Sequence, residues 1–283
     1  MMAPAPVGFA GLGSLGGPMA ERLVGTGTEL RVWDLDASRV QALVDLGATA
    51  ADGPDDLAAS ETLLLVVPDD AAVSELLAGE DGLLARLPPS GVVVVHSTLL
   101  PATVTTLAAE ADSRRIGLLD APVSGGPERA AAGDLTVMVG GPDDAVAAVR
   151  PLLEQLASEV HHVGGSGAGA AVKLANQAML FSALAGVYEG LELAASYGVD
   201  EAAALDVVSS SLGESWVTRH WGFFDDMVRT YDAMGTPPEQ RSWRKDLRDV
   251  VATAEDRGLD LPVSRLLAET LAARVEGRAA EQP

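Results

Sequence analysis

The segment that most constrains the fold is a glycine-rich turn between a short apolar strand and a helix. Val7–Ala10 leads directly into this turn, and Pro18 then suits the first turn of a helix. A G-x-G-x-x-G turn with these flanks permits a tight bend, a close approach of the backbone to a pyrophosphate, and packing of the helix on the strand. The predicted dinucleotide-binding turn consists of Gly11, Leu12, Gly13, Ser14, Leu15 and Gly16.

A carboxylate at the end of the next predicted strand bears on the choice of dinucleotide. Asp34 lies 23 residues after Gly11, close to the spacing at which an acidic side chain binds a ribose 2′-hydroxyl. A 2′-phosphate would meet this carboxylate as a like charge, and residue 35 is leucine rather than arginine. The sequence therefore favours NAD, with NADP as the alternative if Arg39 turns towards the phosphate. We also expect Val67 and Pro68, at the end of a later strand, to contact the cofactor.

Short apolar strands alternate with helical stretches through the first half of the chain. Strands are predicted at 7–10, 29–33, 62–67, 92–96, 117–119, 135–139 and 160–163, with helices between most of them. This rhythm is typical of a parallel, doubly wound sheet. Beyond the glycines of 164–169 the pattern is helical, at 168–197, 200–211, 214–231, 245–257 and 263–277, with Ser242 as a cap. We predict a Rossmann-type α/β domain at 1–164 and an all-α domain at 165–283, joined by a long interdomain helix.

Composition and charge argue against several kinds of partner. The net charge is −22 and no sizeable basic patch occurs, so nucleic acid and anionic membrane surfaces are poor partners. The chain lacks cysteine, which suits a reducing cytoplasm. Residues 1–6 lack the features of a signal peptide, and no apolar run reaches the ~18 residues of a spanning helix. We therefore expect a cytoplasmic protein.

The four histidines show no metal-ligand spacing, although His220 could line a substrate pocket.

Only two lysines, Lys173 and Lys245, occur beside 17 arginines. Arginine stays charged near neutral pH, whereas a desolvated lysine can take or give a proton. Codon bias would explain why lysine is scarce but not where the two remain. Asn176 and Gln177 follow Lys173 by three and four residues in a predicted helix, so the three side chains share one face. They can therefore converge on one ligand.

A second glycine-containing loop reads Asp-Ala-Pro-Val-Ser-Gly-Gly at 120–126. Ser124, Gly125 and Gly126 can aim a hydroxyl and consecutive N–H groups at a carboxylate, although an ordinary turn would have the same residues. Together with the turn at 11–16, Ser97-Thr98 and the Lys-x-x-Asn-Gln segment, this loop resembles the β-hydroxyacid dehydrogenases. That family includes 3-hydroxyisobutyrate dehydrogenase and is related to 6-phosphogluconate dehydrogenase. The resemblance covers essentially the whole chain.

The resemblance implies hydride transfer between a nicotinamide cofactor and a small 3-hydroxy acid or its semialdehyde. Lys173 matches the family's catalytic acid/base, with Asn176 as a catalytic partner. A free lysine is too basic for this role at neutral pH, so burial must make the amine less basic. The substrate carboxylate would bind the serine-glycine loop, and the implied substrate-binding set is Ser124, Gly125, Gly126, Lys173, Asn176, Gln177 and Asp246.

The resemblance also implies cofactor contacts from later segments and an oligomer. Thr98 matches a residue near the nicotinamide, and Lys245 with Asp246 matches a pair that closes over cofactor and substrate. The helical domain often dimerises in this family, so we expect a homodimer or a higher homo-oligomer.

Two other interpretations stay open. The first is an imine reductase of the same architecture, in which a different residue usually stands where Lys173 is. The second is a catalytically silent NAD-binding scaffold protein, against which the retained lysine argues. Residues 221–244 depart from the family's usual approach to Lys-Asp-Leu. Because that region commonly completes the substrate pocket, the particular substrate stays open.

Overall fold

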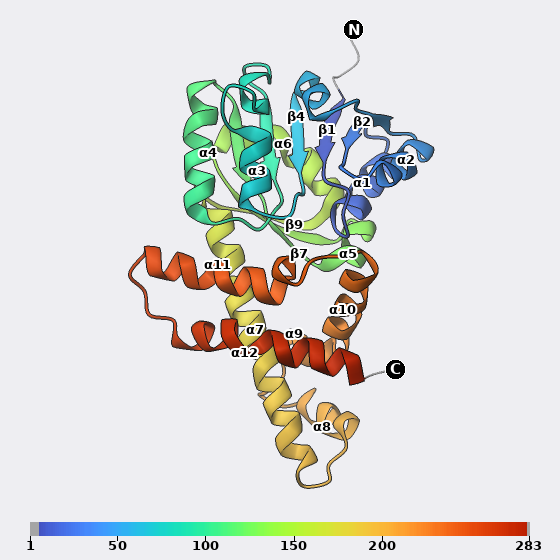
Figure 1. The fold of residues 1–283 in the computed structure, drawn as a ribbon, viewed down its shortest axis with the longest axis vertical. Helices are drawn as coiled ribbons and strands as arrows, with labels where there is room; N and C mark the ends of the chain where they lie inside the picture. Colours follow the sequence, from blue (N-terminus) through green and yellow to red (C-terminus); the bar gives the residue numbers. More distant parts are fainter. Residues whose placement is uncertain (1–5, 282–283) are drawn as a thin grey trace. The chain divides into compact units, whose positions relative to one another are not determined.

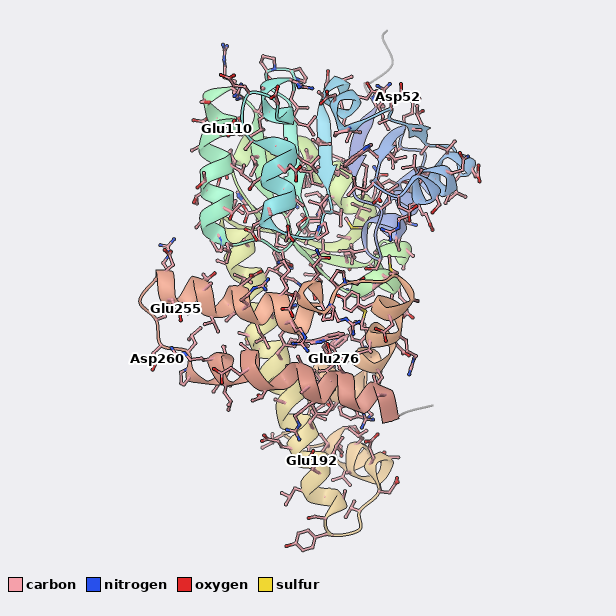
Figure 2. The ribbon with its side chains drawn as sticks, in the orientation of Figure 1. Asp52, Glu110, Glu192, Glu255, Asp260 and Glu276 are labelled. Atoms are coloured by element: carbon pink, nitrogen blue, oxygen red, sulfur yellow. The ribbon has the colours of Figure 1, made fainter. Side chains whose placement is uncertain are left out.

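The computed structural model describes residues 6–281 as two compact units, which divide between Lys173 and Leu174. The first unit is a sheet covered by helices, and the second is all helical (Figure 1). The predicted fold class, a Rossmann-type α/β domain followed by an all-α domain, is confirmed. Acidic side chains occur on both units, and Figure 2 labels Asp52 and Glu110 of the first and Glu192, Glu255 and Asp260 of the second.

The sheet has the strand order β3-β2-β1-β4-β5-β6-β8-β7, with β9 paired to β8. The strands from β1 to β6 pair in parallel, as predicted, whereas β8 runs antiparallel to both β6 and β7. The reversal follows from chain length, because a parallel crossover needs a dozen or more residues and residues 125–134 are fewer. The strands are β1 (Val7–Ala10), β2 (Leu30–Trp33), β3 (Thr49–Ala50), β4 (Thr62–Leu65), β5 (Val92–Val95), β6 (Gly117–Asp120), β7 (Val123–Ser124), β8 (Leu135–Gly140) and β9 (Ala157–Gly164).

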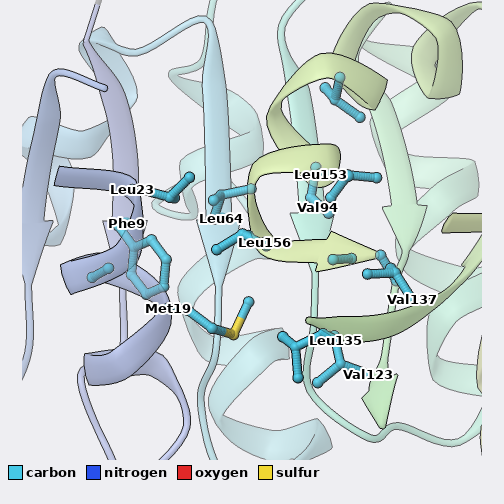
Figure 3. Close-up of a cluster of buried hydrophobic side chains, with 14 of the residues drawn as sticks. Phe9, Met19, Leu23, Leu64, Val94, Val123, Leu135, Val137, Leu153 and Leu156 are labelled. Atoms are coloured by element: carbon cyan, nitrogen blue, oxygen red, sulfur yellow. The ribbon is translucent and has the colours of Figure 1, made fainter. Parts of the chain in front are cut away.

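Successive strand residues point to opposite faces of the sheet, and each face is covered by helices. Phe9, Leu64 and Val94 belong to one apolar cluster, with side chains from α1, α5 and α6 (Figure 3). Their neighbours Ala10 and Leu65 belong to the cluster on the other face, with α3 and α4. The helices of this unit are α1 (Gly16–Gly25), α2 (Ala37–Asp45), α3 (Asp70–Leu77), α4 (Pro101–Ser113), α5 (Gly126–Ala132) and α6 (Asp143–Leu156), with short 3-10 helices at Pro54–Ala59 and Leu83–Ala85.

The second unit is built from the long helix α7 and five shorter helices around an aromatic core. Phe181, Phe224 and Trp243 lie in this core beside aliphatic residues of α12. The helices are α7 (Ala168–Ala195), which begins in the first unit, α8 (Glu201–Val208), α9 (Trp216–Arg219), α10 (Phe223–Ala233), α11 (Ser242–Asp256) and α12 (Pro262–Glu281), with a 3-10 turn at Pro238–Gln240.

Two details of the helical prediction were wrong. The single helix expected at 214–231 is two helices. The first ends at Arg219 with His220 as its C-cap, and the second begins after Gly222, whose φ of 96° is not helical. Ser242 was expected to cap the helix that bears Lys245. Instead α11 begins at Ser242, and its cap residue is Arg241, which makes no capping hydrogen bond with its side chain.

The helix α7 is long and apolar. Within residues 6–281 it is the one helix whose length and mean hydropathy, 1.3 over an 18-residue window, would suit a membrane span. This is weak support for a membrane role, because core helices of soluble proteins meet the same two criteria. The helix also contains Lys173, Asn176 and Gln177, so its apolar sequence is interrupted near its start. The cytoplasmic location stays a prediction.

The first turn of α7 packs against the sheet with no room for a side chain at Gly169. The Asp120 carboxylate, at the end of β6, accepts hydrogen bonds from the backbone N–H groups of Gly167 and Ala170 at 2.9 and 2.7 Å. A Cβ atom at Gly169 would lie 2.4 Å from the carbonyl oxygen of Met138 and 2.6 Å from that of Asp120. Both neighbours are backbone atoms, so this close approach requires glycine.

We predict that Gly169→Ala destabilises the protein by about 1–3 kcal/mol, because the strands or the helix must shift to accept the methyl group. Gly186→Ala is the matched control on the same helix, since a Cβ there meets no atom within 4 Å. The control should be neutral or stabilising by about 0.5–1 kcal/mol. Urea unfolding of both variants measures the effects, and equal free energies of unfolding would contradict the prediction.

Candidate functional site

The turn at residues 11–16 has the backbone geometry that its glycines predict. Gly11 has a φ of 92°, and a Cβ there would lie 2.2 Å from the carbonyl oxygen of Val66. A Cβ at Gly16 would lie 2.0 Å from the carbonyl oxygen of Gly11, whereas one at Gly13 would meet only the Arg39 guanidinium within 4 Å. The start of α1 has no side-chain cap and no acidic residue in its first turn. The first N–H groups of α1 therefore suit a phosphate, and the turn fits a dinucleotide.

Asp34 lies beside this turn and is held by backbone N–H groups. One carboxylate oxygen accepts from Leu12 N–H at 2.6 Å and the other from Asp36 N–H at 2.8 Å. Arg39 lies near two carboxylates, with Nη1 3.9 Å from that of Asp34 and Nε 3.3 Å from that of Asp36. Hydrogen bonds from Ser38 and the Arg39 charge lower the pKa of Asp36. Asp34 and Arg39 therefore lie side by side at the turn. Asp34 could bind the ribose hydroxyl of NAD and Arg39 the 2′-phosphate of NADP, so the geometry is compatible with either cofactor.

The loops after β4 and β5 are tied together by Ser97. Its hydroxyl donates to the carbonyl oxygen of Val67 at 2.7 Å and accepts from Val67 N–H at 3.0 Å. The predicted contact residues Val67 and Thr98 are partly exposed and Pro68 is exposed, each just past the carboxyl end of a parallel strand. Open α/β sheets bind ligands at that edge. Ser97 was not among the predicted site residues, although its pairing with Thr98 in the sequence could have indicated it.

Lys173 lies against the Asp-Ala-Pro-Val-Ser-Gly-Gly loop. Its side chain is buried, and Nζ donates to the carbonyl oxygen of Val123 at 2.9 Å. Ser124 is the next residue, and Gly125 and Gly126 follow with φ values of 145° and 75°. Residues with a Cβ rarely adopt these angles, so the two glycines are required for the path of the loop. The structure thus brings Lys173 to the loop that the sequence predicted for a carboxylate.

Asp120 is a functional candidate that the sequence reasoning missed. It begins the same loop, is 2% exposed and holds the first turn of α7, in which Lys173 follows one turn later. Burial raises the pKa of the Asp120 carboxyl, and the hydrogen bonds from backbone N–H groups oppose this. The acidic residue directly after a buried strand was visible in the sequence. Its partners 47 and 50 residues away were not.

In the helical unit, four predicted residues form a polar network that is buried except at Asn176. Asn176 donates to the side-chain oxygen of Gln177 at 3.1 Å, and Gln177 donates to Asp246 at 2.6 Å. Lys245 Nζ lies 3.8 Å from Asp246 but 2.7 Å from Asp249. Gln177, Lys245, Asp246 and Asp249 are all buried. The network therefore joins α7 to α11, and it contains one carboxylate, Asp249, that the sequence reasoning did not include.

The divergent segment 221–244 mostly builds the helical core. Trp243 is fully buried, and Arg241 and Arg244 both approach Glu276 of α12, at 3.8 and 2.9 Å. Arg241 also pairs with Asp232 at 2.5 Å. These basic groups, which could have bound an anionic substrate, thus have acidic partners within their own unit. The segment's divergence is explained at least in part by packing and ion pairs.

His220 lines a small cavity within the helical unit. Its ring stacks on Trp216 with centroids 4.3 Å apart, and Nδ1 lies 2.9 Å from the carbonyl oxygen of Trp216. The cavity has room for about one water-sized sphere and includes the buried Asp225. Within residues 6–281, no group of three or more histidine or acidic side chains is arranged to hold a metal ion.

Two family models together match nearly the whole chain. The NAD-binding domain of 6-phosphogluconate dehydrogenase matches residues 6–164, and the model described as NAD-binding of NADP-dependent 3-hydroxyisobutyrate dehydrogenase matches residues 167–282. The chain belongs to the β-hydroxyacid dehydrogenase family. It is an NAD(P)-dependent oxidoreductase of the type that acts on CH–OH groups.

Individual relatives agree with this assignment. A 3-hydroxyisobutyrate dehydrogenase of Pseudomonas aeruginosa is 38% identical over 211 residues, 74% of this chain and 71% of the relative. An NAD-dependent L-serine dehydrogenase of the same organism is 36% identical over the same shares. The structure of Mycobacterium tuberculosis 3-hydroxyisobutyrate dehydrogenase with L-serine has a TM-score of 0.82 and 27% identity, covering 98% of this chain and 96% of that one. An imine reductase from Pseudomonas sp. is more distant, at 22% identity and a TM-score of 0.65 over 97% and 95% of the two chains, and shares the fold.

His96, directly before Ser97, is buried and neutral at pH 7. Its Nδ1 lies 2.7 Å from the carbonyl oxygen of Ala121, and because a carbonyl only accepts, Nδ1 carries the proton. Burial lowers the pKa of His96 to about 4, although the hydrogen bond to Ala121 opposes this. At position 96 the unfolded chain therefore binds more protons than the folded chain between pH 6.5 and 4, so the contribution of His96 to stability is lost as pH falls through that range.

We predict that protonation of His96 in the unfolded chain lowers the free energy of unfolding by about 2 kcal/mol between pH 6.5 and pH 5, at about 1.4 kcal/mol per pH unit. His96→Asn keeps a donor for Ala121 but does not titrate, so its stability should fall less over this range. Denaturant unfolding at pH 7 and pH 5 measures the difference. His161→Asn is the control, because His161 is exposed. Equal acid sensitivity of all three proteins would contradict the prediction.

Proposed function

We propose that this dehydrogenase interconverts a small 3-hydroxy acid and its semialdehyde, with Lys173 as the acid/base. The observation that carries the proposal is the contact of Lys173 Nζ with Val123, directly before the Ser124–Gly126 loop. The Lys173 amine thus lies beside a loop whose two glycines adopt positive φ values. A substrate with both a hydroxyl and a carboxylate would need an amine for the first group and such a loop for the second. The L-serine in a related structure is a 3-hydroxy acid of this kind.

The chain's own residues would bind, orient and exchange a proton. The nicotinamide cofactor supplies the hydride acceptor in oxidation and the hydride donor in reduction. In oxidation, the Lys173 amine takes the proton of the substrate hydroxyl as the C–H bond gives up its hydride, and it returns the proton in reduction. Asn176 positions the hydroxyl or the amine, and Ser124, Gly125 and Gly126 anchor the carboxylate.

The two alternatives make different demands on Lys173. An imine reductase of this fold has no need of a lysine that accepts a proton from a hydroxyl, and a silent scaffold protein has no need of an amine at all. The burial of Lys173 argues for the dehydrogenase, because a buried amine costs free energy that a merely solvated cation would not.

We predict that Lys173→Arg lowers turnover by ~10²–10⁴, because arginine keeps the charge but cannot exchange a proton near neutral pH. Cofactor affinity should stay nearly unchanged. The assay follows nicotinamide absorbance with a panel of 3-hydroxy acids, L-serine included, and titrates the cofactor separately by fluorescence. A variant with near-native turnover would remove the basis for this mechanism. A loss confined to the Michaelis constant would make Lys173 a substrate anchor instead.

We further propose that NAD is preferred over NADP, because the Asp34 carboxylate suits a ribose hydroxyl and repels a 2′-phosphate. Asp34→Asn should relax the preference while its remaining oxygen can still accept from Leu12. Arg39→Ala should weaken NADP and leave NAD nearly unchanged. Dissociation constants for both cofactors decide the matter. A native enzyme that binds NADP more tightly would overturn the claim and identify Arg39 as the phosphate ligand.

We also propose that the protein self-associates through its helical unit. The helix α8 has no buried residue, and Met179, Leu193 and Val207 are each about two-thirds exposed. In a homo-oligomer, a second copy of the chain would cover these apolar side chains. We predict at least a dimer by light scattering at micromolar concentration, with Leu193→Asp shifting it towards monomer. A native monomer would refute the proposal.

A further inference from the structure

Lys245 has a closer acidic partner than the one that the sequence motif suggested. Its Nζ lies 2.7 Å from an oxygen of Asp249 and 3.8 Å from the nearer oxygen of Asp246. The three residues all belong to α11, and each residue is no more than 6% exposed. Of these two ion pairs of Lys245, the one with Asp249 is therefore the shorter.

The fold alone does not account for an aspartate at position 249. Aspartate is among the poorer helix formers, and residue 249 lies in the middle of α11. A lysine four residues before an acid is also the less favourable order for a helical ion pair. Burying a carboxylate is costly unless it is paired. The position thus has a specific requirement, and its closest cation is Lys245.

Asp246 is already engaged by α7. One of its oxygens accepts from the Gln177 amide at 2.6 Å, and Gln177 in turn accepts from Asn176. A Lys245 amine that moved onto Asp246 would compete with Gln177 for that carboxylate. The second oxygen of Asp249 lies 4.0 Å from Nε of Arg248, which is largely exposed. Asp249 therefore lies between a buried cation and a solvated one.

We propose that Asp249 is a positioning residue, which fixes the Lys245 amine and leaves Asp246 to Gln177. The inference rests on the expectation, drawn from the family resemblance, that Lys245 closes over cofactor and substrate. Lysine has four rotatable side-chain bonds, so an amine without a fixed partner loses more freedom on binding a ligand. Holding Nζ in advance removes that cost.

A double-mutant cycle tests this proposal on the full-length protein. Lys245→Met, Asp249→Asn and the double variant are compared with native protein for NADH affinity, by fluorescence titration, and for kcat and KM. We expect Asp249→Asn to weaken binding or raise KM by ~10-fold with kcat changed less, and to have no further effect in the Lys245→Met background. Asp249→Glu should restore part of the loss. Asp256→Asn is the matched control, because Asp256 is an exposed acid on the same helix.

The outcomes separate the inference from the function on which it rests. If Lys245→Met weakens binding and Asp249→Asn does not, Asp249 has no positioning role. If Asp249→Asn lowers the melting temperature but leaves affinity and KM native, its role is only structural and the inference is overturned. An equal loss from Asp249→Asn in both backgrounds also overturns it. If Lys245→Met itself changes nothing, the role proposed for Lys245 fails, whereas the role of Lys173 is tested independently.

Discussion

The carboxylate of Asp120 fixes the geometry on which the rest of the first unit's site depends. It accepts two backbone N–H groups at the start of α7, where the partial positive charge of a helix terminus favours an anion. Three residues after Asp120, the carbonyl of Val123 accepts from Lys173. One acidic residue at the end of a strand therefore decides where the long helix begins and which loop its lysine meets. Gly169 is required because this contact brings backbone against backbone.

The features that the sequence predicted well are those set by local pattern. The turn at 11–16 lies between β1 and α1 as its glycines require, and the alternation of strands and helices predicted the parallel part of the sheet. The antiparallel β8 was missed because it depends on how far residues 125–134 can reach, and hydrophobic patterning does not report that. The break at residues 220–222 was missed because a single glycine such as Gly222 can lie within a helix or interrupt it, and only its φ decides.

The residues of the candidate site likewise divide into those that local sequence pattern indicates and those that only the fold brings together. Lys173 and Lys245 stood out by rarity, and Ser124 by its glycine neighbours, so residue type and spacing were enough to select them. Asp249 and Asp120 were not selected, because acidic residues are common in this chain and only burial distinguishes these two. The structural role of a buried carboxylate depends on its hydrogen-bond partners, and those of Asp120 lie about fifty residues away in sequence. Such a partnership is a property of the fold.

The contrast between lysine and arginine takes on physical meaning once burial is known. Both lysines are buried, whereas Arg241 is the one buried arginine among residues 6–281, and it pairs with two acids. Codon bias affects composition but does not depend on burial, so it does not explain why the two remaining lysines are both buried. A guanidinium cannot release its proton near neutral pH and needs room for a planar fork, whereas an ammonium is compact and can exchange a proton. A chain that has arginine at its exposed cationic positions and lysine at two buried ones therefore keeps the amine where its size or its proton is needed.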